Sequence, residues 1–438
     1  MYHYFYYLCK MINDKTSSVS IKTLGCKLNF SESATIEQKL AQKGFVIKTG
    51  YQAADCYIIN SCAVTENSEK KCRQLIHRLK QINPQSKIII IGCYGALKHS
   101  ELLQNQVDMI LGNNDKMQVV DYLEQIFHHK RQAIEKLPKD SFFSAYSLHE
   151  RTRSFLKIQD GCDYHCTYCT VWKARGNSRS DSIENVVNNA KKIVANDIKE
   201  IILSGVNIGD FRTEKGENFY QLLQQLVQVE GLERIRISSI EPNLLTQEII
   251  DLAGENHKIL PHFHIPLQSG NNRILSLMRR KYQREFFADK IRQVKSCLPH
   301  ACIAADVIVG FPTETEADFE DTYQFLDSIP VNMLHIFPYS QRPDTIAANM
   351  EGQISQGVKN QRVKKLIALS DKKKLAFYQE NQGKTYPVLV EHKKENGFLY
   401  GFTPNYIKVK FPYQSHIANQ IINITLSQLD SNNIYITK

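Results

Sequence analysis

Three cysteines, Cys162, Cys166 and Cys169, stand close together in the stretch "GCDYHCTYC" of this 438-residue chain. Three residues separate the first pair and two separate the second pair. A tight loop with this spacing lets three thiolates hold one iron–sulfur cube and leaves one iron without a protein ligand. An open iron can bind a substrate or a cofactor. The spacing therefore predicts a reactive [4Fe–4S] site.

Zinc is the main alternative metal for these thiols. A fourth zinc ligand could come from His165, inside the loop, or from a distant residue. Structural zinc sites, however, are usually built from two Cys-x2-Cys pairs, and the second pair is missing here. Three inert cysteines in an exposed loop would be open to oxidation. The spacing and position therefore favour the iron–sulfur interpretation.

A second set of cysteines lies near the N-terminus, with Cys26 in "GCKLN", Cys62 in "NSCAVT" and Cys93 in "GCYGA". Each follows a β-branched run, "VSIKTL", "CYIIN" or "KIIII". The carboxyl ends of parallel strands share one edge of a sheet, so these thiols are candidates for one common site. The alternative is that each is a small buried thiol near a strand end. The residues alone leave both interpretations open.

The wider sequence indicates which elements position these cysteines. Residues 1–135 alternate β-branched runs with helical patterns, which predicts a parallel α/β domain. After a linker at 131–150, residues 148–378 contain six strand candidates separated by helices, as in a partial (β/α)6 barrel. Residues 379–438 are rich in Val, Ile, Tyr and Phe and predict a small β-barrel. The expected fold class is α/β with three domains.

Composition limits the setting and the partners of the protein. No apolar run approaches the ~18 residues that a membrane span needs, and no secretory signal is evident, so we expect a soluble cytoplasmic protein. In a reducing cytoplasm, eleven cysteines suit metal or catalytic sites better than disulfides. A net charge of +10 favours a polyanionic partner such as nucleic acid.

These motifs carry a family resemblance. "GCDYHCTYC" resembles the signature of radical S-adenosylmethionine (SAM) enzymes, and "TLGCKLN", "NSCAVT" and "GCYGA" resemble the three cysteine motifs of methylthiotransferases. "LSGVNIGDF", "RISSIEPNLL", "HFHIPLQSG" and "LMRRKY" are similar to the branch that modifies N6-threonylcarbamoyladenosine in tRNA. The C-terminal segment resembles the TRAM domain, which this family uses to hold its substrate. The resemblance covers nearly the whole chain.

The resemblance implies two [4Fe–4S] clusters and two molecules of SAM for each product. At the first cluster, one electron would cleave SAM to a 5'-deoxyadenosyl radical, which removes hydrogen from C2 of the adenine at position 37, 3' of the anticodon. The second cluster would carry the sulfur that is methylated and inserted. The implied cluster ligands are Cys162, Cys166, Cys169, Cys26, Cys62 and Cys93.

The resemblance also implies further contacts. SAM contacts are expected from Tyr168, Gly205, Glu241, Gln268, Arg280 and Gly310, and substrate contacts from Arg175, Phe402 and Lys408. Aromatic side chains can stack on bases while lysines contact phosphates. Each glycine could instead belong to an ordinary strand-end turn, each arginine could be a solvated charge, and the C-terminal aromatics could fill the barrel interior. A flavodoxin or ferredoxin is the expected electron donor, and the chain is expected to be a monomer.

Some features depart from the family pattern or leave alternatives open. Trp172 and Lys173 stand where the family commonly has a proline. The remaining cysteines match no ligand position and are expected to be buried structural thiols: Cys9, Cys56, Cys72, Cys297 and Cys302. Within the family, the substrate could instead be isopentenyladenosine in tRNA or an aspartate of a ribosomal protein. A different class, a non-catalytic RNA-binding protein with a structural metal, also fits the composition.

Overall fold

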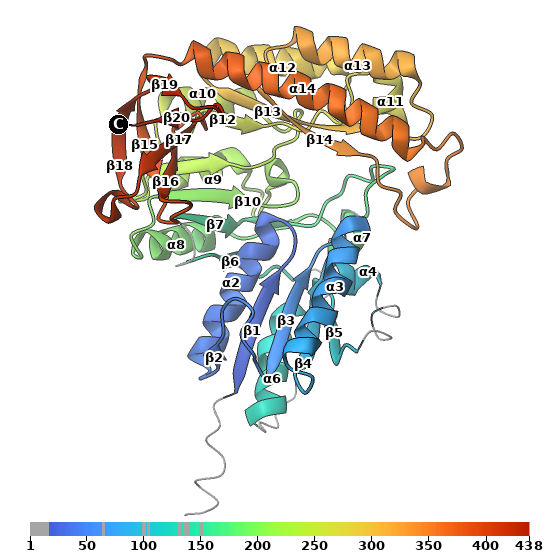
Figure 1. The fold of residues 1–438 in the computed structure, drawn as a ribbon, viewed down its shortest axis with the longest axis vertical. Helices are drawn as coiled ribbons and strands as arrows, with labels where there is room; N and C mark the ends of the chain where they lie inside the picture. The colour runs from blue at the N-terminus through green and yellow to red at the C-terminus, as the bar shows by residue number, and fades with distance from the viewer. Residues whose placement is uncertain are drawn as a thin grey trace, which may run out of the picture. The chain divides into compact units, whose positions relative to one another are not determined.

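The structure is a computed structural model (Figure 1) that describes residues 17–63, 66–98, 102, 106–128, 134, 138, 141–148 and 152–437. The chain forms two compact units. The first comprises Met1–Phe143 with Lys173–Arg175, and the second comprises Ser144–Trp172 with Gly176–Lys438. Cys9 and half of the expected linker at 131–150 lie outside the described residues. Within the described part of the chain, no helix is both long and apolar enough to span a membrane.

The first unit contains a five-stranded parallel sheet with the order β2-β1-β3-β4-β5. Its strands are β1 (Ser18–Thr23), β2 (Val46–Ile47), β3 (Cys56–Ser61), β4 (Lys87–Gly92) and β5 (Met109–Leu111). Its helices are α2 (Lys27–Gln42), α3 (Glu66–Ile82), α4 (Cys93–Leu97) and α6 (Val119–His128), with the 3-10 turn η1 (Lys116–Gln118) before α6. This is the parallel α/β arrangement predicted from the β-branched runs.

Both faces of this sheet are buried, which explains why its strands are continuous apolar runs. Ile59 and Ile90 pack on one face with Leu79 of α3. Ile58 and Ile89, the alternate residues, pack on the other face with α2 and α6. The side chains of a strand alternate between its two faces, so a run such as "KIIII" supplies both cores at once.

The second unit begins with a partial barrel of mostly parallel strands. One sheet has the order β11-β10-β7-β6 and the other has the order β12-β13-β14. The strands are β6 (Ala145–Tyr146), β7 (Arg153–Lys157), β10 (Glu200–Ser204), β11 (Arg234–Ile237), β12 (His262–His264), β13 (Cys302–Val309) and β14 (Met333–Pro338). The six strands predicted from the sequence are all present, and β6 adds an antiparallel edge to β7. Isolated bridges between Ile235 and Ile259 and between Ser239 and His264 connect the two sheets.

Helices cover the outer face of this partial barrel (Figure 1). They are α8 (Ile183–Val194), α9 (Phe219–Leu226), α10 (Gln247–Glu255), α11 (Asn272–Leu277), α12 (Arg284–Cys297), α13 (Glu316–Ser328) and α14 (Gln356–Glu380). Their apolar faces pack with Leu203, Ile237 and Val307 of the strands in one large core. Capping boxes at Asn218 and Thr315 fix where α9 and α13 begin.

The chain after α14 forms a curled six-stranded sheet, a half-barrel with the order β18-β15-β16-β17-β20-β19. Its strands are β15 (Thr385–Val390), β16 (Phe398–Phe402), β17 (Lys408–Pro412), β18 (Ile421–Thr425), β19 (Gln428–Leu429) and β20 (Tyr435–Ile436). Leu399, Val409 and Phe411 are buried in its core. The domain boundary predicted at residue 379 falls at the end of α14, inside the second compact unit.

A buried charge cluster joins this half-barrel to the partial barrel. Glu200 is fully buried and pairs with Arg236 at 2.8 Å, while Arg234 donates a hydrogen bond to the carbonyl of Phe402 at 3.1 Å. Arg153 pairs with Glu391 at 2.5 Å. Because a buried charge that loses its partner is costly, these pairs hold the two parts of the unit in one arrangement.

Candidate active site

Cys162, Cys166 and Cys169 lie in the loop between two short antiparallel strands, β8 (Gln159–Asp160) and β9 (Arg179–Ser180). Gly161 begins the loop with φ +72°, and a Cβ there would lie 1.9 Å from the carbonyl oxygen of Asn177. Only glycine fits such a close approach of backbone to backbone. The amide of Cys162 then donates to the carbonyl of Gly176 at 3.1 Å and closes the loop.

Each of the three sulfurs in this loop accepts an N–H donor. The amide of Tyr164 lies 3.4 Å from Cys162 Sγ, and the amide of Val171 lies 3.4 Å from Cys169 Sγ. Arg280 Nη1 lies 3.3 Å from Cys166 Sγ. Donors aimed at sulfur stabilise thiolates that ligate a metal and tune the potential of an iron–sulfur cluster.

Burial acts against free thiolates in this loop. It raises the pKa of Cys162 to about 12 and that of Cys169 to about 11. A bound cation reverses this because a coordinating thiol is deprotonated outright. One buried and two half-buried thiols, each with an N–H donor at its sulfur, fit a metal cluster better than inert core packing.

Arg280 connects the cysteine loop to a later strand end. Its side chain is almost fully buried, and it forms an ion pair with Glu241 and hydrogen bonds with the hydroxyl of Tyr282. Tyr282 in turn donates to the carbonyls of Pro266 and Leu267. The structure therefore brings Glu241 and Arg280 together beside Cys166, and each holds the other in place.

Tyr168 and Gln268 lie near the same ends of the barrel strands. Tyr168 packs against a small apolar cluster that includes Met278 and Phe311, and Ile308 packs on that cluster too. Gln268 has φ +71°, and its amide donates to the carbonyl of Asp306 at 2.8 Å. Both residues are thus fixed by their surroundings at the edge where the cysteine loop lies.

The two glycines predicted to approach SAM are each required by close packing within the chain. A Cβ at Gly205 would lie 2.7 Å from Ile208 and 2.8 Å from Gln159 Oε1. A Cβ at Gly310, which has φ +72°, would lie 2.4 Å from Lys359. This packing accounts for both glycines, and their contact with SAM stays a prediction.

In the first unit, Cys26, Cys62 and Cys93 occupy equivalent positions at the carboxyl edge of the parallel sheet. Cys26 is the N-cap of α2, Cys62 follows β3, and Cys93 is the first residue of α4, directly after β4. A Cβ at Gly25 would lie only 2.8 Å from Cys62 Cβ, so the first two cysteine loops touch. Ser61 and Gly92 are register partners, which places Cys62 and Cys93 on adjacent strand ends.

Two asparagines that the sequence did not single out position these loops. Asn29 Nδ2 donates to the carbonyls of Leu24 and Ser61, on either side of the Cys26 and Cys62 loops. Asn113 Nδ2 lies 3.5 Å from Cys93 Sγ and 2.7 Å from the carbonyl of Ala174. The side chains of Asn29 and Asn113 therefore support the second cysteine set much as backbone amides support the first.

Arg175 belongs to a buried charge network in the same unit. Its Nη1 lies 3.3 Å from Glu32 Oε1, and its Nη2 donates to Asn29 Oδ1 at 2.7 Å. Lys116 also pairs with Glu32, and both side chains are fully buried. Arg175 is 2% exposed, so it is not a solvated surface charge. Its predicted contact with substrate stays a prediction.

The C-terminal half-barrel carries aromatic and lysine side chains on its outer face. Lys408 Nζ lies 3.9 Å from the ring centre of Tyr400, and Lys410 Nζ lies 4.0 Å from that of Phe398. Phe402 stacks on Tyr406 with centroids 4.8 Å apart, and the guanidinium of Arg153 lies 4.8 Å from the ring centre of Phe402. The residues between these outer positions fill the core, so the aromatics of β16 are not its interior.

The remaining cysteines follow the expectation with one correction. Cys56, Cys72 and Cys302 are buried, as predicted. Cys297 is exposed, and the prediction that it is a buried thiol was wrong. It is the last residue of α12, and its sulfur lies 3.7 Å from the carbonyl oxygen of Ile250 on the neighbouring helix α10. Trp172, at the family's usual proline position, packs on His165 with centroids 4.5 Å apart.

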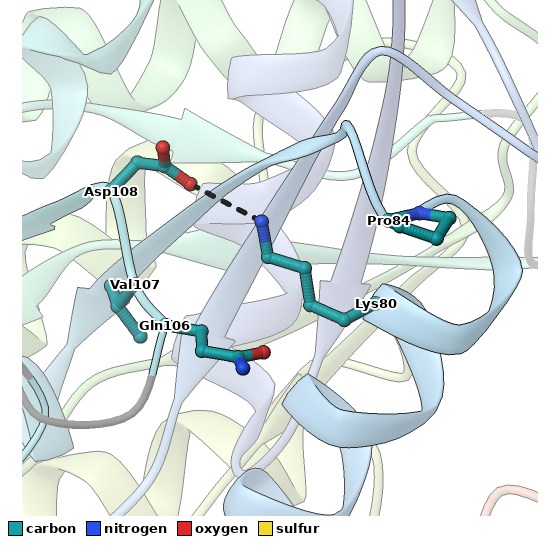
Figure 2. A pocket seen from close by; sticks show the side chains of 5 residues that line it. All are labelled: Lys80, Pro84, Gln106, Val107 and Asp108. Atoms are coloured by element: carbon teal, nitrogen blue, oxygen red, sulfur yellow. Dashed lines mark ion pairs between the residues drawn. The ribbon is translucent and has the colours of Figure 1, made fainter.

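A surface hollow in the first unit lies at the opposite edge of the parallel sheet from Cys26, Cys62 and Cys93. Figure 2 shows its lining side chains, Lys80, Pro84, Gln106, Val107 and Asp108. Lys80 and Asp108 are 3.8 Å apart, and Asp108 also accepts from Lys87. The hollow lies where β4 and β5 begin, whereas the cysteines follow the strand ends. It is therefore separate from the cysteine set of the first unit.

Comparisons with known proteins agree with this geometry. The family model "Radical SAM superfamily" matches residues 156–326, and "Uncharacterized protein family UPF0004" matches residues 18–112. The structure of the radical SAM methyltransferase TsrM from Kitasatospora setae, with tryptophan and a SAM analogue, is similar in fold. Its TM-score is 0.57 at 11% identity, with 76% of this chain and 75% of that chain covered. Fold and cysteine loop thus define a radical SAM enzyme.

The sequence relatives narrow this class. The chain is 39% identical to the threonylcarbamoyladenosine tRNA methylthiotransferase of Bacillus subtilis, with 94% of each protein covered. It is 38% identical to the enzyme of the same name from Aquifex aeolicus, covering 90% of this chain and 96% of that one. It is 31% identical to the tRNA-2-methylthio-N(6)-dimethylallyladenosine synthase of Pelotomaculum thermopropionicum, covering 93% and 94%. The chain belongs to the radical SAM methylthiotransferase family, whose members are transferases.

Proposed function

We propose that the protein inserts a methylthio group at C2 of N6-threonylcarbamoyladenosine in tRNA, at the position 3' of the anticodon. The observation that carries this proposal is the presence of two separate sets of cysteines, each gathered at strand ends. One set alone suits many radical SAM reactions. A second set of cysteines lies in the N-terminal α/β unit and is supported by Asn29 and Asn113. This second set would provide a site for the sulfur atom that is inserted into the product.

Cys162, Cys166 and Cys169 would hold the cluster that binds SAM. When bound, this cluster and SAM supply a 5'-deoxyadenosyl radical, and the chemistry is the cofactor's own. The protein contributes donors to each sulfur, with Arg280 nearest to Cys166. Tyr168, Glu241 and Gln268 lie around the same edge, where they would orient SAM and exclude water.

Cys26, Cys62 and Cys93 would hold a second [4Fe–4S] cluster, which makes two clusters per chain. The loops of these cysteines are joined by Asn29 and by the contact between Gly25 and Cys62. Three protein ligands at each site would leave one iron open for an exogenous ligand, SAM at the first site and sulfur at the second. The protein would hold both open iron positions in place and exclude water from them.

The tRNA would contact the outer face of the half-barrel. Tyr400 with Lys408 and Phe398 with Lys410 pair half-buried rings with cations, which suits stacking on bases and contact with phosphates. The net charge of +10 supports a polyanionic substrate. Phe402 is packed against Tyr406 and Arg153 within the chain, so Lys408 is the better of the two predicted contacts.

The choice of nucleoside rests on the relatives. The threonylcarbamoyladenosine enzymes are 35–39% identical to this chain, and the dimethylallyladenosine enzymes are 30–33% identical. Isopentenyladenosine is therefore the second candidate substrate. We expect a flavodoxin or ferredoxin to supply the electron and the chain to act as a monomer.

Anaerobic reconstitution tests the proposal. Two clusters give about eight irons per chain, and dithionite should then produce 5'-deoxyadenosine from SAM. Addition of tRNA carrying threonylcarbamoyladenosine should yield the 2-methylthio nucleoside. Cys297→Ser is a matched control because Cys297 is exposed and belongs to neither set. One zinc ion per chain without SAM cleavage would refute the proposed enzymatic activity and favour a structural role for the metal.

A further inference from the structure

The inner face of β12–β14 carries side chains that the reaction described above does not use. Along β13, Ile303, Ala305 and Val307 pack into the outer core beneath the helices. Strand side chains alternate, so Asp306 and Ile308 lie on the opposite, inner face of the partial barrel. The register pairs Asp306 with His335 and Ile308 with Phe337. The inner face therefore has a polar layer and, two residues further along, an apolar layer.

The polar layer, which we term the inner polar cluster, consists of His264, Asp306 and His335. His264 Nε2 lies 2.6 Å from Asp306 Oδ1. The rings of His264 and His335 are 4.9 Å apart at 60°. One polar atom from each residue lies within 4.8 Å of the others, and the cluster remains accessible because His335 is exposed. Donors and an acceptor thus converge on one small volume inside the barrel.

The apolar layer points toward the cysteine loop. Ile308 packs on the cluster that contains Tyr168, which lies between Cys166 and Cys169 in the sequence. Phe337 beside it is 48% exposed, an unusual position for a large aromatic ring. Two residues along a strand span about 6.5–7 Å. The exposed ring of Phe337 near the cysteine loop therefore lies about the length of a nucleobase from the inner polar cluster.

This spacing matches a purine with a polar group on N6. A base stacked on Phe337 would project its N6 substituent toward His335 and Asp306. A threonylcarbamoyl group has a carboxylate, which accepts hydrogen bonds, and a hydroxyl, which can donate one. His335 can offer a donor and Asp306 an acceptor, whereas an isopentenyl group has no polar atom that could pair with either side chain.

We propose that the inner polar cluster recognises the carboxylate and hydroxyl of the N6 substituent, with Phe337 stacking on the adenine, and so sets the choice of nucleoside. This rests on the proposed function and names the part of the chain that would select the substrate. Asp306 is held by His264, so its negative charge is balanced in part before the substrate enters. The substrate carboxylate then meets the imidazole of His335, and the neighbouring Asp306 is already hydrogen-bonded to His264.

Two forms of one tRNA test the inference, one with threonylcarbamoyladenosine and one with unmodified adenosine. The wild-type protein should prefer the first form. His335→Phe should lower kcat/KM for that form about 10- to 100-fold, the loss of one hydrogen bond to a charged group, and shrink the preference equally. His335→Gln, which keeps a donor, should retain more of the preference. Iron content and SAM cleavage without tRNA should not change in either variant.

His257→Phe is the matched control, since His257 is an exposed histidine just after α10, outside the half-barrel. An unchanged preference in His335→Phe would overturn the inference while leaving the proposed function intact. No turnover of the threonylcarbamoyl form by the wild type would overturn both. Retention of one non-iron divalent metal that is lost in His335→Phe would also overturn it, because two histidines and a carboxylate would then be a metal site.

Discussion

Replacing Arg280 by Gln should make the potential of the cluster at Cys162, Cys166 and Cys169 more negative. Arg280 Nη1 lies 3.3 Å from Cys166 Sγ, and the guanidinium is also paired with Glu241. A cation that donates to a ligand sulfur stabilises the reduced cluster more than the oxidised one, because reduction adds negative charge near the donor. Its loss therefore favours the oxidised state.

The size of this change follows from the contact. Hydrogen bonds to charged groups contribute about 1.5–3 kcal/mol, and we take about 1 kcal/mol of that as the part gained on reduction. For one electron, 59 mV corresponds to about 1.4 kcal/mol, so the potential should fall by about 40 mV. In Arg280→Gln, Glu241 also stays behind as an unbalanced carboxylate, which adds to the fall.

The assay is a redox titration followed by electron paramagnetic resonance, in a Cys62→Ala background that removes the second cluster's signal. Arg280→Gln combined with Glu241→Gln removes both charges, so its potential should lie between those of the wild type and the single variant. Arg284→Gln is the control, because Arg284, the first residue of α12, pairs with Glu285 and Asp321. An unchanged or more positive potential in Arg280→Gln would refute this account of the contact.

Three further predictions concern the cysteines and one helix start. Cys166→Ala should abolish SAM cleavage, whereas Cys62→Ala should keep SAM cleavage and lose sulfur transfer; equal losses in both assays would contradict separate roles. Burial raises the pKa values of Cys72 and Cys302 to about 12, whereas Cys297 is exposed. Iodoacetamide should therefore modify Cys297 before Cys72 and Cys302, which peptide mass spectrometry would measure. Equal rates of modification would contradict the burial of Cys72 and Cys302. Although burial raises the pKa of Asp318, hydrogen bonds from Arg273 and Thr315 lower it from 3.8 to about 2. The stability that the ionised Asp318 contributes is therefore complete above about pH 4 and is lost as the pH falls toward 2. As the pH is lowered below 4, the urea concentration at the unfolding midpoint should decrease more steeply for the wild type than for Asp318→Asn. Parallel curves for the two proteins would contradict this.

Local signals in the sequence predicted much of this fold. Each β-branched run became a strand, and each cysteine expected at a strand end lies there, because strand period and turn composition are encoded within a few residues. The loop of Cys162, Cys166 and Cys169 was equally evident from spacing alone. These features needed no knowledge of what packs against them.

Contacts between segments that are distant in the chain could not be predicted from the sequence. Arg175 was expected as a substrate contact or a surface charge, and it is buried against Glu32, which lies in a different part of the chain. Arg280 and Glu241 were each assigned to SAM without any sign that they pair. The inner polar cluster was missed because His264, Asp306 and His335 come from three strands and meet only through their register. Pairings of this kind depend on tertiary structure, which periodicity does not encode.

Nucleoside mass spectrometry of tRNA from cells that lack this gene is the decisive test of the proposed activity. We expect the 2-methylthio form of N6-threonylcarbamoyladenosine to disappear while N6-threonylcarbamoyladenosine itself remains. Restoring the wild-type gene should bring the methylthio form back, and a Cys62→Ala gene should not. Persistence of the methylthio form without the gene, or loss of the methylthio form of isopentenyladenosine in its place, would show that the protein does not have this activity.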